Sequence, residues 1–160
     1  MSNGDMFLKI DGTRSGVIKG EANDSAHPNE IDIVSWSWGM RSSSAMGGAG
    51  AAAKTAMDAI TINKQVDSAS TALMSVMRAN ELIKKAVLTV RKAGTVPLEY
   101  FILTIENARI TSYDVGTAPG ADHIMDEKLT FSFQKISIDY HAQDATGAKK
   151  GGSNFSADVT

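Results

Sequence analysis

The stretch that most resembles a catalytic motif is Gly48–Thr55, which reads Gly-Ala-Gly-Ala-Ala-Ala-Lys-Thr. A phosphate-binding loop carries a second glycine directly before its lysine, and this chain has Ala53 at that position. Such a loop also needs a helix that begins at the lysine, so that backbone amides point at the phosphate. The residues from Thr55 to Ile62 do not have the pattern of an amphipathic helix. A nucleotide-binding enzyme that uses 48–55 is therefore the alternative hypothesis, and we favour a surface loop of small residues.

Other residue types that carry chemistry are scattered along the chain. The three histidines, His27, His123 and His141, are far apart, and no two have the i, i+4 spacing of a helical zinc site. The neighbouring carboxylates Asp126 and Glu127 precede a strand-like segment, where we expect them to face solvent. The chain has no cysteine, which excludes a disulfide and a thiolate ligand or nucleophile. This distribution predicts no enzyme active site, no metal site and no cofactor.

The composition is that of one soluble folded domain. The chain has 160 residues, of which 42% are apolar and 21% are charged. Its 18 acidic and 16 basic side chains are spread along the sequence without a basic block, so nucleic-acid binding is not expected. No apolar run is long enough to cross a bilayer, and the first residues lack the pattern of a signal peptide. We expect a protein that is made in the cytoplasm and does not insert into membranes.

Apolar residues alternate with period two in most segments, which predicts a mainly β protein. The long run from Ile124 to Tyr140 changes phase: odd positions hold Leu129, Phe131 and Phe133, and even positions hold Ile136, Ile138 and Tyr140. This change of phase near Gln134 predicts a β-bulge in a long bent strand that serves two surfaces. The other expected strands cover 6–10, 17–20, 31–38, 59–62, 87–91 and 98–110.

One helix is expected at about 68–80, because apolar side chains recur there on one helical face. These side chains are Ala69, Ala72, Leu73, Val76 and Met77. Asp67 or Ser68 is the expected N-cap. The helix is expected to plug one end or side of a small barrel.

A long segment of small residues, about 41–58, separates two of the expected strands. Extended loops of this length in compact domains usually have a function or lack order. Small residues let backbones approach closely, so we expect this loop to contact a neighbouring subunit. The candidate contact residues are Arg41, Met46, Gly48 and Lys54. Near the other end of the chain, the composition predicts a flexible tail over 153–160, which leaves a single domain over 1–152.

The segment His27–Gly39 reads His-Pro-Asn-Glu-Ile-Asp-Ile-Val-Ser-Trp-Ser-Trp-Gly and closely resembles the signature of the Hcp (haemolysin-coregulated protein) family. In this chain the signature ends in Trp36, Trp38 and Gly39. The segments 6–12, 18–21, 88–94 and 129–152 are similar to the other blocks of the family and occur in the same order. The resemblance therefore covers nearly the whole chain up to about Gly152, although it fades over 39–62.

The resemblance implies a small β-barrel of two packed antiparallel sheets with one flanking α-helix. It also implies a homo-hexameric ring that stacks into the inner tube of a type VI secretion system, surrounded by contractile sheath proteins and capped by a spike protein. Such a tube is expelled by sheath contraction, so the protein would be secreted without a signal peptide. A second implied role is to carry or chaperone small effectors in the ring lumen.

Ser37 is the candidate lumen residue. It lies between Trp36 and Trp38 on an expected strand, where successive side chains point to opposite faces. The tryptophans bury large apolar areas and are expected on the core side, which leaves Ser37 on the other face. In the architecture that the resemblance implies, that face is the pore wall and Ser37 contacts effectors. The alternative is that Ser37 fills a tight contact between subunits.

Overall fold

The computed structural model describes residues 5–42, 55–92, 98–117, 120, 123–143 and 149–159. These residues form a mainly β structure with one α-helix, as the sequence predicted. The elements are, in chain order, β1 (Met6–Gly12), β2 (Gly16–Ile18), β3 (Ile31–Asp32), β4 (Ser35–Ser37), β5 (Met40–Ser42), β6 (Thr55–Met57), β7 (Ile60–Gln65), α1 (Ser70–Arg78), β8 (Ile83–Lys92), β9 (Leu98–Thr117), β10 (Met125–Ser132), β11 (Lys135–Gln143) and β12 (Lys149–Asp158).

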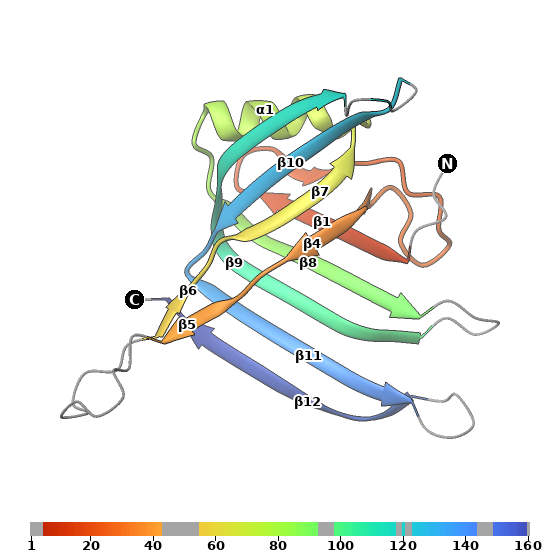
Figure 1. Ribbon diagram of the computed structural model, residues 1–160, viewed down its shortest axis with the longest axis vertical. Coiled ribbons are helices and arrows are strands. Elements are labelled where there is room, and N and C mark those ends of the chain that lie inside the picture. Colours follow the sequence, from red (N-terminus) through yellow and green to blue (C-terminus); the bar gives the residue numbers. More distant parts are fainter. Residues whose placement is uncertain are drawn as a thin grey trace.

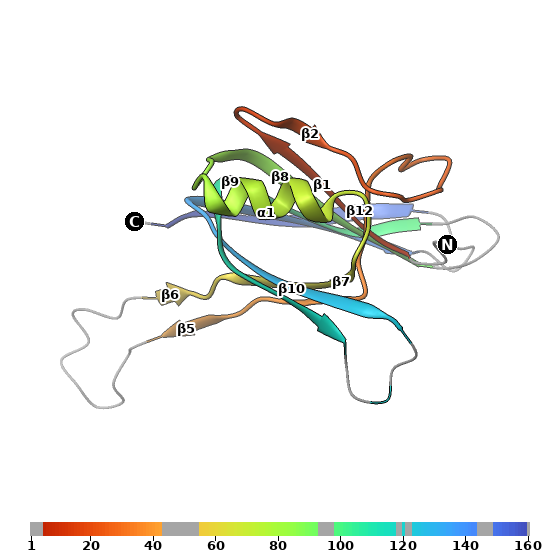
Figure 2. The same cartoon turned by 90° about the horizontal axis from the view of Figure 1, so that it is seen from above.

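The strands form two facing layers that share β9 (Figures 1 and 2). The first half of β9 pairs with β8 and β11 in the first layer, which also contains β1, β2, β3 and β12. The second half pairs with β10 in the second layer, which continues through β7 to β4. Between the halves lies Asn107, whose φ of 51° places it in the left-handed region that asparagine tolerates. The described strands do not close into a barrel, so the architecture is two packed antiparallel layers.

The predicted change of phase near Gln134 marks a crossing between the layers. β10 ends at Ser132 in the second layer, and β11 begins at Lys135 in the first. Phe131 and Ile136 are both buried in the same core, although they have opposite sequence parity. The expected long bent strand is therefore two strands joined by a two-residue crossing. The expected strand over 31–38 divides in the same way, because β3 pairs with β1 and β4 pairs with β7.

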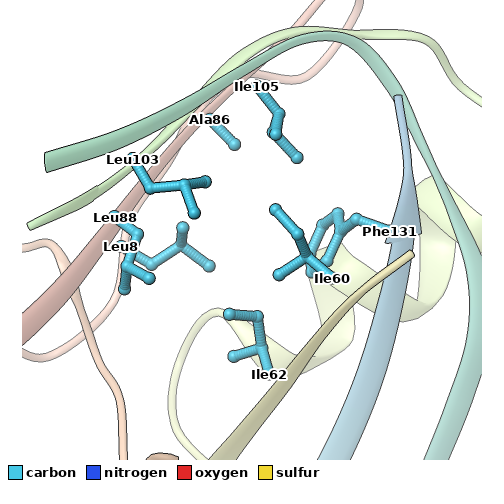
Figure 3. Close-up of a pocket in the computed structure, with 8 residues that line it drawn as sticks. All are labelled: Leu8, Ile60, Ile62, Ala86, Leu88, Leu103, Ile105 and Phe131. Carbon is cyan, nitrogen blue, oxygen red and sulfur yellow. The ribbon is translucent and has the colours of Figure 1, made fainter. Parts of the chain in front are cut away.

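The core lies between the inner faces of the two layers (Figure 3). Its centre retains a void of about 10 Å³ that is lined only by apolar side chains. A water molecule there would have no polar partner, so the void is dry and too small for a ligand. The lining residues are Leu8, Ile60, Ile62, Ala86, Leu88, Leu103, Ile105 and Phe131.

The helix α1 is shorter than the expected 68–80 but buries the predicted face, with Ala69, Leu73 and Val76 fully covered. Ala69 occupies the N-cap position, and its backbone N–H donates to the Asp67 carboxylate at 2.9 Å. Asn80 follows the C-cap Ala79 and has a φ of 52°. The backbone N–H groups of Asn80 and Glu81 donate to the carbonyl groups of Met77 and Val76, which forms a Schellman motif. No helix among the described residues is long and apolar enough to span a membrane.

The expected loop over 41–58 and the expected flexible tail over 153–160 both contain strand residues. The loop over 41–58 begins and ends in the β5–β6 hairpin, where Ser42 pairs with Thr55, and its residues 43–54 lie outside the described part of the chain. Most of the tail expected over 153–160 belongs to β12, which pairs with β11 as far as Asp158 opposite Lys135. The small residues that suggested flexibility lie on an edge strand, where backbone hydrogen bonds fix the chain.

Candidate functional site, a hydroxyl-lined sheet face and an overhanging strand pair

Four hydroxyl side chains form one row across the second layer. The strand register places Ser37 opposite Thr61, Thr61 opposite Thr130, and Thr130 opposite Ser112. The Thr130 hydroxyl lies 2.5 Å from that of Ser112 and 2.9 Å from that of Thr111. A second polar row lies two residues along each strand from the first. It consists of Ser35, Asn63, Lys128 and Asp114. We call these two rows the hydroxyl face.

The opposite face of the same strands is apolar and faces the core. Trp36 lies opposite Ile62, Ile62 opposite Leu129, and the last two side chains are fully buried. The Trp36 ring stacks on Phe101 of the first layer, with ring centroids 5.3 Å apart. Trp38 is also partly buried against the core, whereas Ser37 is exposed. The side-chain directions are thus those that strand alternation predicted, and the assignment of Ser37 to a lumen stays a prediction.

Gly39 and Arg41 lie at the exit from this face. A Cβ atom on Gly39 would come within 3.2 Å of the Asp58 carboxylate, so a side chain there would crowd it. Arg41 donates to the same carboxylate at 3.1 Å, and both side chains are exposed. These residues join the hydroxyl face to the β5–β6 hairpin. The other loop candidates, Met46, Gly48 and Lys54, lie outside the described residues.

A buried ion cluster lies behind the hydroxyl face. The side chains of Lys64 and Glu127 are both 0% exposed and contact each other through Nζ and Oε1. The Lys64 ammonium also donates to the Asp67 carboxylate at 2.9 Å. Glu127 accepts further hydrogen bonds from the hydroxyls of Ser70, at 2.7 Å, and Tyr113. The cluster connects β7, β10 and β9 to the first turn of α1.

The expectation that Glu127 faces solvent is wrong. Met125 already belongs to β10, and alternation along that strand places Glu127 on the same face as Leu129 and Phe131. The odd numbering that Glu127 shares with these apolar residues was a usable signal. This parity conflicts with the ordinary tendency of adjacent carboxylates to lie in water.

The first layer extends beyond the second at β11 and β12 (Figure 1). One row of inner-face side chains crosses five strands, in the order Leu8, Leu88, Leu103, Ile138 and Phe155. Leu88 and Leu103 are each 1% exposed, but Phe155 is 39% exposed. Tyr140, which follows Ile138 by two residues on β11, is 44% exposed. The apolar row therefore continues beyond the part of the first layer that the second layer covers. We call β11 and β12 the overhang.

Among the described residues, the candidates for chemistry do not come together, and 48–54 lie outside the described part of the chain. Thr55 begins the strand β6, where a phosphate-binding loop requires the first turn of a helix. His27 and His123 lie in separate parts of the chain, and His27 is committed to two carboxylates, Glu30 and Glu99. The described residues contain no group of three or more His, Asp or Glu side chains that could hold a metal ion.

Residues 7–140 match the protein family described as "Type VI secretion system effector, Hcp". This match covers most of the chain, including the signature that contains Trp36 and Trp38. The chain belongs to the Hcp family. A curated relative, protein hcp1 of Pseudomonas aeruginosa, is 38% identical over 151 residues, which cover 92% of this chain and 90% of the relative.

Solved Hcp structures share the fold of this Hcp protein. A type VI secretion system effector from Yersinia pestis is 30% identical, with a TM-score of 0.76 and coverage of 97% of this chain and 100% of that one. Hcp1 from Salmonella typhimurium is 28% identical, with a TM-score of 0.76 and coverage of 96% and 93%. A further type six secretion system protein has a TM-score of 0.85 at 19% identity, which shows likeness of fold alone.

Proposed function

We propose that this Hcp protein assembles into a homo-hexameric ring and that such rings stack into the inner tube of a type VI secretion system. The overhang carries this proposal, because its apolar row continues the core beyond the second layer of the same chain. An apolar strip on a soluble protein marks a contact surface. A second copy that covers the overhang with the edge of its second layer at β4 would create a head-to-tail interface, which closes into a ring by rotation.

In this ring the hydroxyl face lines the lumen, and Ser37 contacts cargo. Two observations support this orientation. The overhang belongs to the first layer, so contacts between copies leave the outer face of the second layer uncovered. That face carries neutral hydroxyl groups in one row and Lys128 opposite Asp114 in the next. A hydrated wall without apolar patches holds small effectors weakly, through hydrogen bonds that water can replace.

The β5–β6 hairpin is the proposed contact with a neighbouring subunit or ring. It projects from the second layer, away from α1 (Figure 2). Arg41 and Asp58 pair on its exposed surface, where a partner can reach both. This proposal gives the segment 41–58 the contact with a neighbouring subunit or ring that its length and small residues suggested.

The remaining partners follow from membership of the family. We propose that contractile sheath proteins surround the tube, that a spike protein caps it, and that small effectors travel in its lumen. Sheath contraction would then carry the protein out of the cell or into a target cell. The mass of the assembly formed by the purified chain tests the ring on which all these partners depend.

Replacing Ser37 with glutamate should reduce effector retention and leave the ring intact. Ser37 is exposed, so the larger side chain is accommodated, but one carboxylate per copy narrows the lumen and changes its charge. The loss of a hydrogen-bonded contact corresponds to at least about fivefold less retained effector, or ~1 kcal/mol. Quantitative mass spectrometry of co-purified proteins measures the ratio of effector to ring.

Ser156→Glu is the matched control for this substitution. Ser156 is exposed on β12, on the outer face of the first layer, and its variant carries the same added charge away from the lumen. Equal effector retention in Ser37→Glu, Ser156→Glu and the unchanged chain would contradict the lumen assignment. Dissociation of the Ser37→Glu ring would instead place Ser37 in the contact between subunits.

A further inference from the structure

His27 lies at the contact between a surface lobe and the first layer, on the side away from the core. The lobe is the segment 20–30, which folds back on itself through hydrogen bonds from Gly20 to Asn29 and between Ala22 and both Asn29 and Glu30. The His27 ring is stacked on Phe7 of β1, with centroids 4.7 Å apart and an interplanar angle of 12°. Phe7 is fully buried although it points away from the core, because the His27 ring of the lobe and the Arg91 guanidinium of β8, 4.9 Å from the ring centroid, cover it.

Both ring nitrogens of His27 contact carboxylates. Nδ1 lies 2.9 Å from Glu30 within the lobe, and Nε2 lies 3.0 Å from Glu99 at the start of β9. A neutral imidazole has one N–H and one lone pair, so only the doubly protonated ring can donate to both carboxylates. The residue is 8% exposed, so water offers little substitute for either contact. The geometry requires the imidazolium form.

A second pair of charges anchors the lobe to the first layer. Asp24 accepts from the His27 backbone N–H and forms a two-pronged pair with Arg91 of β8, at 2.6 and 3.0 Å. Hydrogen bonding to Arg91 lowers the pKa of Asp24 to about 2, so this pair stays ionised. Arg91 also contacts Asp5 at 3.4 Å. Among the described residues, the contact between His27 and Glu99 is therefore the lobe anchor that a proton near neutrality controls.

We propose that His27 is a proton-dependent latch, which holds the lobe on Phe7 while it is doubly protonated and loosens the lobe when it loses a proton. After deprotonation one ring nitrogen presents a lone pair to a carboxylate oxygen, which is repulsive. The Asp24–Arg91 pair still tethers the lobe, so the lobe opens without detaching. The latch is a property of the single chain and does not rest on ring assembly.

The direction of the pH dependence follows from the pKa of His27. Burial alone lowers this pKa, but the hydrogen bonds and charges of Glu30 and Glu99 outweigh burial and raise it above the ordinary 6.5. A group with a raised pKa stabilises the folded state fully below its unfolded pKa, and this stabilisation is lost as the pH rises through the folded pKa. The lobe is thus fixed in mildly acidic solution and loosens in alkaline solution.

Two measurements on the full chain test the latch between about pH 5 and pH 9. Nitrogen NMR of 15N-histidine protein reports protonation of the His27 ring, and hydrogen exchange reports protection of the lobe amides. We expect both ring nitrogens to be protonated at pH 6.5. We also expect lobe protection, corrected for the intrinsic pH effect, to fall severalfold along the same curve as the ring titrates.

Variants separate the latch from simple packing. Glu99→Gln keeps the shape of a side chain that is 36% exposed, and it should lower the pKa of His27 and move the loss of lobe protection to lower pH. His27→Gln should abolish the pH dependence, while His123→Gln, at an exposed histidine, should leave it unchanged. The proposal would be overturned if the pKa of His27 were 6.5 or lower. It would also be overturned if protection of the lobe amides did not change as the His27 ring titrates.

Discussion

Replacing Lys64 with methionine should lower the free energy of unfolding by about 3–5 kcal/mol, because it leaves a buried carboxylate without its cation. Glu127 is 0% exposed and accepts hydrogen bonds from Ser70 and Tyr113, which cannot neutralise its charge. Methionine fills nearly the same volume as the lysine stem, so the loss reports charge rather than a cavity. Urea unfolding at one fixed protein concentration measures the change, since assembly also contributes to stability.

Two further variants isolate the buried pair. Lys128→Met removes a lysine next to Glu127 in sequence but on the exposed face of β10, and it should change stability by less than about 0.5 kcal/mol. The double variant Lys64→Met with Glu127→Met should recover much of the loss, because a buried ion pair is often replaceable by apolar side chains. Equal losses in Lys64→Met and Lys128→Met would show that the cluster does not hold α1 against the second layer.

Replacing Phe155 with aspartate should dissociate the ring and leave the subunit folded. Phe155 ends the apolar row of the overhang and is already 39% exposed, so the isolated subunit tolerates a charge there. In the ring the carboxylate would be buried against a neighbouring copy without a partner. Truncation or charging of a central contact costs about 2 kcal/mol or more per interface, and the ring contains several. Sedimentation velocity and far-ultraviolet circular dichroism measure assembly and fold separately.

Ser156→Asp is the matched control for the overhang. It adds the same charge one residue further along β12, where the side chain points to the opposite face. We expect rings from this variant at the concentration at which Phe155→Asp is monomeric. The reverse pattern would place the subunit contact on the outer face of the first layer.

Periodicity alone predicted the elements with long, regular patterns. The helix was found because Ala69, Leu73 and Val76 share one face. The change of apolar parity between Phe133 and Ile136 marked the place where β10 ends and β11 begins, although a bulge in one bent strand was expected there. Both signals are local and reflect burial of side chains along one element. The Trp36–Trp38 pair was also placed correctly, because two tryptophans on one strand face require a core.

Features that depend on pairing between distant strands could not be predicted from the sequence. The hydroxyl row joins residues such as Ser37 and Thr130, whose alignment depends on the register of β4 on β7 and of β7 on β10. The strand structure of 153–158 depends on pairing with β11. The Gly-Gly pair and the small residues of this segment do not predict a strand. The carboxylates that hold His27 come from the lobe and from β9, and only the tertiary structure brings Glu99 to it.

Native mass spectrometry of the purified, unmodified chain tests the central claim most directly. The apolar row of the overhang predicts that two copies meet through unlike surfaces, and such an interface closes into a ring with a definite number of subunits. We expect one dominant assembly with six times the mass of a single chain, which persists on dilution to about micromolar concentration. A stable monomer at that concentration would contradict the account.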